Sequence, residues 1–100
     1  MKLYIDTSDR EKIVIGIDDE KFEKQVAERS SQVLLPFIDE VLKKKKKTFE
    51  DIKEIEVNTG PGSFTGLRVG VAVADTLGFV LKIPVNGKNV LEENIEIQYR

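Results

Sequence analysis

Residues 60–70 read GPGSFTGLRVG and place four glycines and a proline between a strand pattern and a long helical pattern. The strand pattern lies at 54–58, where Ile55 and Val57 alternate with polar residues, and helix-period apolar residues follow the loop. The loop therefore connects the end of a strand to the N-terminus of a helix. Anions commonly bind at such a position.

Two phosphate-binding patterns fail on this loop. The Walker pattern needs a Lys followed by Ser or Thr after its last glycine, and here Leu67 and Arg68 follow Gly66. The dinucleotide fingerprint needs a small residue where Thr65 stands, and no acidic ribose ligand lies at the right distance. Local chemistry favours a structural interpretation, in which the glycines let the chain turn and pack the helix closely on the sheet.

Three ordered segments of the chain resemble the bacterial TsaB family, also called YeaZ. Two of them are residues 3–8 (LYIDTS) and 34–42 (LLPFIDEVL). The third is the signature loop, which consists of Gly60, Pro61, Gly62, Ser63, Phe64, Thr65, Gly66, Leu67 and Arg68.

The resemblance runs from residue 3 to about residue 87. It implies an α/β fold, a single lobe of the actin, hexokinase and Hsp70 type with a ribonuclease-H-like sheet. It also implies a non-catalytic partner of TsaD in making threonylcarbamoyladenosine in tRNA, acting with a TsaE-like ATPase in a larger complex.

The chain departs from the family pattern in two ways. Family members carry two such lobes, so we expect a TsaB-like N-terminal lobe at 1–87 and a short tail at 88–100 in place of the second lobe. The family also usually shows a His before its leucine-rich helix segment. This chain has SSQV at 30–33 and no histidine.

Composition indicates one small soluble domain. One hundred residues with 40% apolar side chains suffice for one core that buries about two-thirds of the unfolded surface. A net charge of -2 gives no general attraction to nucleic acid, so we expect tRNA contact to be indirect at most. The absence of cysteine fits a reducing, cytoplasmic location, and the most apolar stretch, 69–81, is expected to be too short for a membrane span.

Hydrophobic periodicity predicts the order βββαβαβ. The expected strands are 2–6, 12–17 and 21–28, with Phe22 and Val26 facing inward, followed by 54–58 and 83–86. The expected helices are 31–46 and 64–82, with a short turn beginning at Thr48 and Phe49. These elements predict a mixed five-stranded sheet with helices.

Both predicted helices carry wide apolar arcs. The arc is about 180° in the first helix and about 240° in the second, more than one sheet face covers. The two helices either bury the excess against each other or form a protein interface, and the resemblance favours an interface because TsaB-like proteins pair through these helices. The expected interface residues are Val33, Leu34, Phe37, Ile38, Val41, Leu42, Val73 and Leu77.

Single polar residues receive structural interpretations. Pro36 is expected in the first turn or so of its helix as a start signal, and the five lysines at 43–47 are expected to be a solvated helix end. Asp6 lies where nucleotide-binding relatives place a metal-facing carboxylate, but a turn-forming role is favoured. Arg68 shares a helix face with Asp75, which favours an exposed or bridging role.

No catalytic constellation is apparent. The sequence lacks paired His, Cys or acidic residues with metal-ligand or triad spacing, so we expect neither enzymatic activity nor a cofactor or metal. The leading hypothesis is a TsaB-like scaffold that docks on TsaD and forms a homodimer when alone. The alternatives are a nucleotide- or phosphate-binding fragment of an actin-type ATPase and a self-associating remnant with no role in tRNA modification.

Overall fold

An antiparallel meander opens the chain in the computed structural model, which describes residues 1–26 and 30–88. Its strands are β1 (Lys2–Asp6), β2 (Lys12–Ile17) and β3 (Glu20–Gln25). Buried apolar residues alternate with less buried ones along β1, so the strand turns one apolar row toward the core. The third strand ends earlier than predicted, and the prediction for residues 27 and 28 lies outside the described residues.

Strand β4 (Glu54–Val57) makes the sheet mixed. It pairs in parallel with β1, with Leu3 opposite Ile55, and the strand order is β3-β2-β1-β4. A parallel neighbour requires a crossover, which consists of helix α1 (Ser30–Lys44) and the short 3₁₀ helix Phe49–Asp51. The predicted α/β class and mixed sheet are confirmed.

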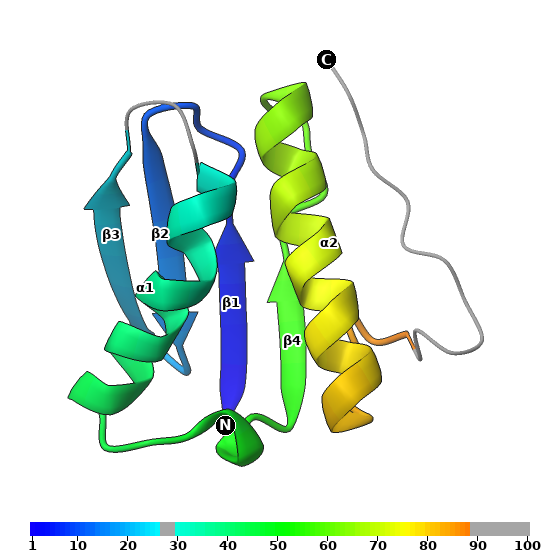
Figure 1. Cartoon of the computed structure of the whole chain (residues 1–100). Helices are drawn as coiled ribbons and strands as arrows, with labels where there is room; N and C mark the ends of the chain where they lie inside the picture. The colour runs from blue at the N-terminus through cyan, green and yellow to red at the C-terminus, as the bar shows by residue number, and fades with distance from the viewer. Residues whose placement is uncertain (27–29, 89–100) are drawn as a thin grey trace.

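Both helices cover the same face of the sheet (Figure 1). Helix α1 packs on β2, helix α2 (Phe64–Leu81) packs on β4 and β1, and the two helices contact each other. The core lies between the sheet and the helices. Its fully or almost fully buried members are Leu3, Ile5, Ile13, Ile15, Ile17, Leu34, Ile38, Val41, Leu42, Ile52, Ile55, Val57, Leu67, Ala74 and Val85.

The predicted fifth strand at 83–86 is wrong. In that segment Val85 alone pairs with the sheet, through an isolated parallel bridge to Ile55. Asn86 and Gly87 follow with φ of 52° and 78°, the positive values of a type I′ turn, and this turn brings Lys88 back opposite Val85. The chain therefore leaves the edge of β4 before a strand can form.

Helix α1 differs from its prediction at both ends. It begins at Ser30, so the exposed Pro36 lies well past the first turn and the prediction of a start signal there is wrong. At the other end Lys46 is left-handed, with φ of 57°, and the Lys47 N–H bonds the Leu42 carbonyl at 2.8 Å. This closure stops the helix at Lys44, two residues before the predicted end.

Helix α2 is the one helix in the described chain that is long and apolar enough, by length and composition, to cross a membrane. The stretch 69–81, expected to be too short for a membrane span, forms only part of this helix of 18 residues. Its buried residues Leu67, Val71 and Ala74 nevertheless pack in the core with the sheet. The core helix of a folded domain has the same properties.

Candidate functional site

The glycine-rich loop connects the end of β4 to the first turn of α2. Gly60 has φ of 122° and precedes Pro61 with a cis peptide bond. Its N–H donates to Asn58 Oδ1 at 2.9 Å, which holds the start of the loop. Ser63 is the N-cap of α2, since its Oγ accepts from the Gly66 N–H at 3.4 Å.

Glycines of this loop and of α2 lie against the residues that follow β1. A Cβ built on Gly62 would lie 2.5 Å from Ser8 Cβ, and a Cβ on Gly66 or Gly70 would lie closer still to Thr7 oxygen atoms. Gly66 and Gly70 are four residues apart and therefore share one face of the helix. That face approaches Thr7 more closely than any side chain would allow.

Hydrogen bonds join the same two segments. Thr7 is the one buried polar residue in the core of the described chain, and its hydroxyl donates to the Gly66 carbonyl. The Ser63 N–H donates to the Ser8 carbonyl at 2.9 Å. These contacts agree with the structural interpretation of the loop, in which its glycines pack α2 onto the sheet.

Asp6 is held by donors from both sides of the loop. Its Oδ1 accepts from Ser8 N–H at 2.9 Å, Ser8 Oγ at 2.6 Å and Asn58 Nδ2 at 3.2 Å, and its Oδ2 accepts from the Tyr4 hydroxyl at 3.2 Å. Partial burial raises the pKa of Asp6, but the donated hydrogen bonds outweigh it and leave the pKa below its ordinary value. Burial and the neighbouring Asp6 raise the pKa of Tyr4 to about 12. The turn-forming role predicted for Asp6 is confirmed.

The first turn of α2 offers little to an anion. The Gly66 N–H already bonds Ser63, and the Arg68 guanidinium lies over the Phe64 ring, 5.3 Å from its centre. A hollow of 340 Å³ beside the loop is lined by two carboxylates, Asp9 and Glu11, together with Arg10, Ser8, Gly62 and Ser63. Carboxylates at this position would repel a phosphate.

Comparisons with known proteins identify the family of the chain. Over residues 23–99 the chain matches the family model described as TsaD, tRNA N6-adenosine threonylcarbamoyltransferase. It is 40% identical over 58 residues to the tRNA threonylcarbamoyladenosine biosynthesis protein TsaB of Buchnera aphidicola subsp. Schizaphis graminum, covering 58% of this chain and 28% of the relative. The chain belongs to the TsaB/TsaD family. The resemblance to TsaB seen in the sequence is confirmed.

Other members of the family match over similar stretches. TsaB of Escherichia coli is 33% identical over 61 residues, which cover 61% of this chain and 26% of the relative. A tRNA N6-adenosine threonylcarbamoyltransferase of Dictyoglomus turgidum is 42% identical over 64 residues, covering 64% of this chain and 19% of the relative. The chain thus spans less than a third of the length of these TsaB/TsaD relatives.

A solved structure shares the fold. YeaZ from Pseudomonas aeruginosa superposes with a TM-score of 0.72 at 26% identity, covering 84% of this chain and 41% of that protein. The α/β lobe described above is therefore a lobe of the TsaB/YeaZ type.

Most of the predicted interface residues of this TsaB/TsaD family member lie in its own core. Leu34, Phe37, Ile38, Val41 and Leu42 are between 0% and 6% exposed. Val33, Val73 and Leu77 are partly buried against the same core. Phe37 and Val41, which an interface would need to be exposed, are buried because the sheet and α2 together cover the wide apolar arc of α1.

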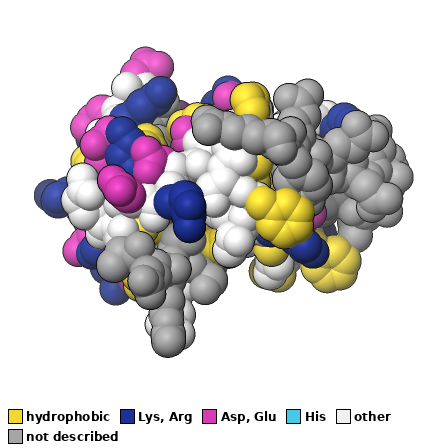
Figure 2. All heavy atoms as spheres, turned by 90° about the horizontal axis from the view of Figure 1, so that it is seen from above, with side chains coloured by type: hydrophobic (Ala, Val, Ile, Leu, Met, Phe, Trp, Pro, Cys, Tyr) yellow, Lys and Arg dark blue, Asp and Glu magenta, His cyan; other side chains and the backbone are white. Residues whose placement is uncertain are grey.

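Helix α2 instead supplies the exposed apolar surface. Phe64, Phe79 and Val80 are 51%, 59% and 65% exposed, and on α1 Leu35 is 45% exposed. A groove of 520 Å³ runs along the outer side of α2, lined by Phe64, Thr65, Arg68, Val69, Ala72 and Val73. Figure 2 shows exposed hydrophobic side chains on the side of α2, whereas charged side chains gather on the side of β2 and β3. From the sequence, Val73 is predicted at the interface but Leu35, Phe79 and Val80 are not, because periodicity does not tell which part of an apolar arc is covered.

The five lysines at 43–47 stabilise the C-terminal end of α1. Lys43 pairs with Asp39 at 2.9 Å, Lys45 pairs with Glu20, and the Lys44 ammonium lies 6.0 Å from the centre of the Phe22 ring. The cations also complement the helix dipole. Three of the five lysines thus have partners within the lobe, which agrees with the predicted helix-end role.

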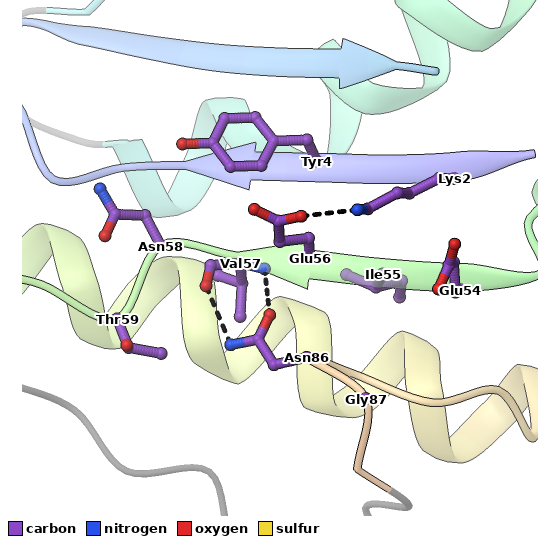
Figure 3. Close-up of a pocket in the computed structure, with 10 residues that line it drawn as sticks. All are labelled: Lys2, Tyr4, Glu54, Ile55, Glu56, Val57, Asn58, Thr59, Asn86 and Gly87. Atoms are coloured by element: carbon purple, nitrogen blue, oxygen red, sulfur yellow. Dashed lines mark hydrogen bonds and ion pairs between the residues drawn. The ribbon is translucent and has the colours of Figure 1, made fainter. Parts of the chain in front are cut away.

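The uncovered face of the sheet carries a polar hollow of 660 Å³ (Figure 3). Lys2 pairs with Glu56 across it at 2.6 Å, and the Lys21 ammonium lies 5.1 Å from the centre of the Tyr4 ring. In the described residues no group of three or more His, Cys, Asp or Glu could hold a metal ion. In this hollow Lys2 and Glu56 therefore neutralise each other.

Proposed function

We propose that this chain is a non-catalytic, TsaB-like partner in the biosynthesis of threonylcarbamoyladenosine in tRNA, and that it docks on a TsaD-type protein through α2. Relatives named as tRNA threonylcarbamoyladenosine biosynthesis proteins support the pathway. The observation that carries the docking proposal is the exposed apolar surface on α2, next to the signature loop. Such a surface on a small domain is typical of a protein interface.

The docking surface is a face of α2 that we call the valine face, formed by Val69, Val73 and Val80. Val69 and Val73 line the groove and are partly buried, whereas Val80 is 65% exposed. At 100° per residue these positions lie within about 40° of arc, so a partner helix can contact all three. The polar outer residues of α1, such as Gln32 and Asp39, suit the rim of the contact better than its centre.

The signature loop supports docking indirectly. Its glycines fix α2 against β1 through Thr7 and Ser8, so the valine face is presented by a rigidly packed helix. Beside the loop, the Asp6 carboxylate accepts hydrogen bonds from the backbone N–H and the hydroxyl of Ser8, so these polar groups already have partners within the lobe. The proposal therefore leaves the chemistry and the tRNA contact to the partner, with a TsaE-like ATPase joining a larger complex in the cytoplasm.

A pull-down with the cognate TsaD tests the docking proposal. Val80→Asp places an unpaired charge in a dry contact, which costs several kcal/mol and should lower affinity at least about 100-fold. Leu35→Asp is the matched control, because it puts the same charge on an exposed apolar position of α1. Both variants should keep the parent's circular dichroism and melting temperature. Failure of the parent to bind TsaD, or equal binding by Val80→Asp, would refute docking through this face.

Calorimetry with Mg-nucleotide tests the alternative of an ATPase fragment. We expect no heat of binding at nucleotide concentrations near about 1 mM, because Arg68 is turned onto Phe64 and Asp6 is fully engaged. Micromolar binding of ATP or ADP would favour the nucleotide-binding fragment instead.

A further inference from the structure

A mostly apolar groove of 520 Å³ lies on the N-terminal half of α2. Its lining extends from Phe64 to Val73, which is about 14 Å along the helix axis. Thr65 and Ala72 are exposed positions in this lining, and they lie nearly in line because seven residues make almost two full turns. All of the lining residues belong to α2, so no other element of residues 1–26 and 30–88 closes over the groove.

Arg68 is the one charged residue that lines the groove, and its charge is positive. Its guanidinium lies over the Phe64 ring, 5.3 Å from the centre, which leaves the N–H edge available to an acceptor. Among the described residues Arg68 forms no ion pair. An occupant that combines apolar side chains with acidic residues therefore complements this groove.

The sequence of residues 89–100, which lie outside the described residues, has this combination. Ile95, Ile97 and Tyr99 alternate with Glu96 and Gln98, the pattern of an extended segment with one apolar side. In an extended segment the distance from Ile95 to Tyr99 is about 13 Å, close to the length of the groove. The same stretch contains three glutamates and one arginine, so its net charge is opposite to that of Arg68.

The described chain ends at a point from which this segment reaches the groove. Val85 bridges to Ile55 of β4 and Lys88 lies opposite Val85, so residue 88 lies at the β4 edge of the sheet, on the side of α2 rather than of α1 (Figure 1). Seven residues lead from Lys88 to Ile95, a span of up to about 24 Å, and α2 itself is about 27 Å long. Covalent attachment also gives the segment an effective concentration on the order of millimolar, so a weak contact suffices.

We propose that residues 95–99 of this chain occupy the groove and run antiparallel to α2, with Ile95 beside Ala72 and Tyr99 beside Thr65. The direction follows from the topology. Ile55 is near the start of β4, whereas α2 begins beyond the end of β4, so a segment that comes from residue 88 meets the Ala72 end of the groove first. In this arrangement the three apolar side chains face the helix, and Glu96 lies level with Arg68.

The occupied groove has a consequence for docking, which rests on the function proposed above. Val69 and Val73 belong both to the groove and to the valine face, so the segment and a TsaD-type partner exclude each other there. The segment is therefore a built-in competitor that the partner must displace. The contact between the segment and α2 needs no partner and is tested without one.

Disulfide trapping in the full chain tests the contact, because the chain has no cysteine of its own. Two cysteines join only when their Cα atoms come within about 7 Å. Ile95→Cys combined with Ala72→Cys should form an intramolecular disulfide under mild oxidation in dilute solution, seen as the loss of two hydrogens in the intact mass. Tyr99→Cys combined with Thr65→Cys should do the same, since the two pairs together fix the direction of the segment.

The control pair is Ile95→Cys with Glu54→Cys. Glu54 is exposed at the start of β4, next to the residue that Val85 contacts, so a segment without a preferred position would reach it at least as easily as Ala72. We expect this pair to cross-link at least about tenfold more slowly than the Ala72 pair, because the groove holds the segment away from it. Equal rates for the two pairs, or disulfides that join two chains instead of one, would overturn the proposal.

The alternation of the segment gives a second, independent measurement. In the chain with the Ala72 pair, Ile97→Asp places a charge against the apolar wall and should slow cross-linking at least about tenfold. Gln98→Asp adds the same charge on the opposite side of the segment and should leave the rate almost unchanged. Equal effects of the two substitutions would overturn the proposed orientation. Circular dichroism should be the same for all of these variants, since none of them changes a buried residue of the described lobe.

TsaD binding by the disulfide-locked chain tests the competition. The oxidised Ala72 pair should bind the cognate TsaD at least about tenfold more weakly than the same protein after reduction, because the lock prevents displacement of the segment. Equal binding by the oxidised and reduced forms would overturn the competition. If neither form nor the parent binds TsaD, the proposed docking fails, whereas the cross-linking rates still decide whether the segment occupies the groove.

Discussion

The side-chain amide of Asn86 forms hydrogen bonds with both backbone groups of Val57. Its Oδ1 accepts from the Val57 N–H at 2.8 Å, and its Nδ2 donates to the Val57 carbonyl at 3.0 Å (Figure 3). Two residues earlier in β4, the Ile55 N–H donates to the Pro84 carbonyl and the Ile55 carbonyl accepts from the Asn86 N–H. One asparagine therefore continues the pairing of β4 where the chain itself turns away, and it protects an edge that would otherwise be open to other strands.

Removal of this amide should weaken the edge of the sheet. Asn86→Gly keeps a residue that adopts positive φ easily, so it removes the two hydrogen bonds without adding backbone strain. We expect a loss of about 1–2 kcal/mol in the free energy of unfolding, measured by urea denaturation. Lys46→Gly, at an exposed residue that also has positive φ, is the control and should change stability less. An Asn86→Gly variant as stable as the parent would show that water replaces the amide at no cost.

Strand and helix positions could be predicted because their side-chain periods are strong. Alternation at β1 and β4 and the apolar arcs of both helices depend on local geometry alone. The failed fifth strand shows the limit of that reasoning. Val85 continues the apolar pattern, but Asn86 and Gly87 adopt the positive φ values of a turn. This turn reverses the chain before a strand can form.

The burial of the α1 residues that were predicted at an interface has a different cause. A wide apolar arc on α1 indicates that much surface is buried, but it does not tell what buries it. In the fold, the sheet covers one side of α1 and α2 covers another. The α1 residues Phe37 and Val41 are therefore core residues. The sequence did place Arg68 and Asp75 on one face. The exposure of Phe64 and Phe79 on the same helix could not be predicted from the sequence, because it depends on which part of α2 the sheet covers.

Gly66→Ala should disrupt the lobe. The added Cβ would overlap the Thr7 carbonyl, which is backbone and cannot rotate away. Overpacking of this kind costs about 3 kcal/mol or more, a large share of the stability of a small domain. The measurement is thermal unfolding followed by circular dichroism. Thr76→Ala, at an exposed position of the same helix, should leave the melting temperature almost unchanged, and survival of Gly66→Ala with the parent's melting temperature would contradict the packing.

Asp6 should contribute to stability in a pH-dependent way. The pKa of Asp6 in the folded state lies below the ordinary value of an aspartate, so its contribution to stability is fully present above that ordinary value and is lost as the pH falls through the folded pKa. Asp6→Asn should therefore lower the free energy of unfolding at pH 7. The variant should also lose less stability than the parent as the pH falls. Urea denaturation between about pH 2 and pH 7 measures both effects.

Asp51 provides the comparison for Asp6, since its pKa is also lowered but by exposed contacts, chiefly the Thr48 N–H. Asp51→Asn should change the loss of stability on acidification less than Asp6→Asn does, because solvent screens an exposed site. Equal effects of the two substitutions would mean that the hydrogen bonds from Ser8, Asn58 and Tyr4 add nothing beyond an ordinary surface carboxylate.

Asp75 should act on the stability of the monomer with the opposite sign. Burial raises the pKa of Asp75 in the folded state above the ordinary value of an aspartate, so the ionised carboxylate destabilises the folded monomer at pH 7 and protonation removes this cost. Asp75→Asn should therefore raise the free energy of unfolding of the dilute monomer at pH 7, by less than about 1 kcal/mol because the group keeps contact with solvent. The gain should vanish as the pH falls below the unfolded pKa. A variant that loses monomer stability at pH 7 would show that Asp75 has a stabilising partner within its own lobe.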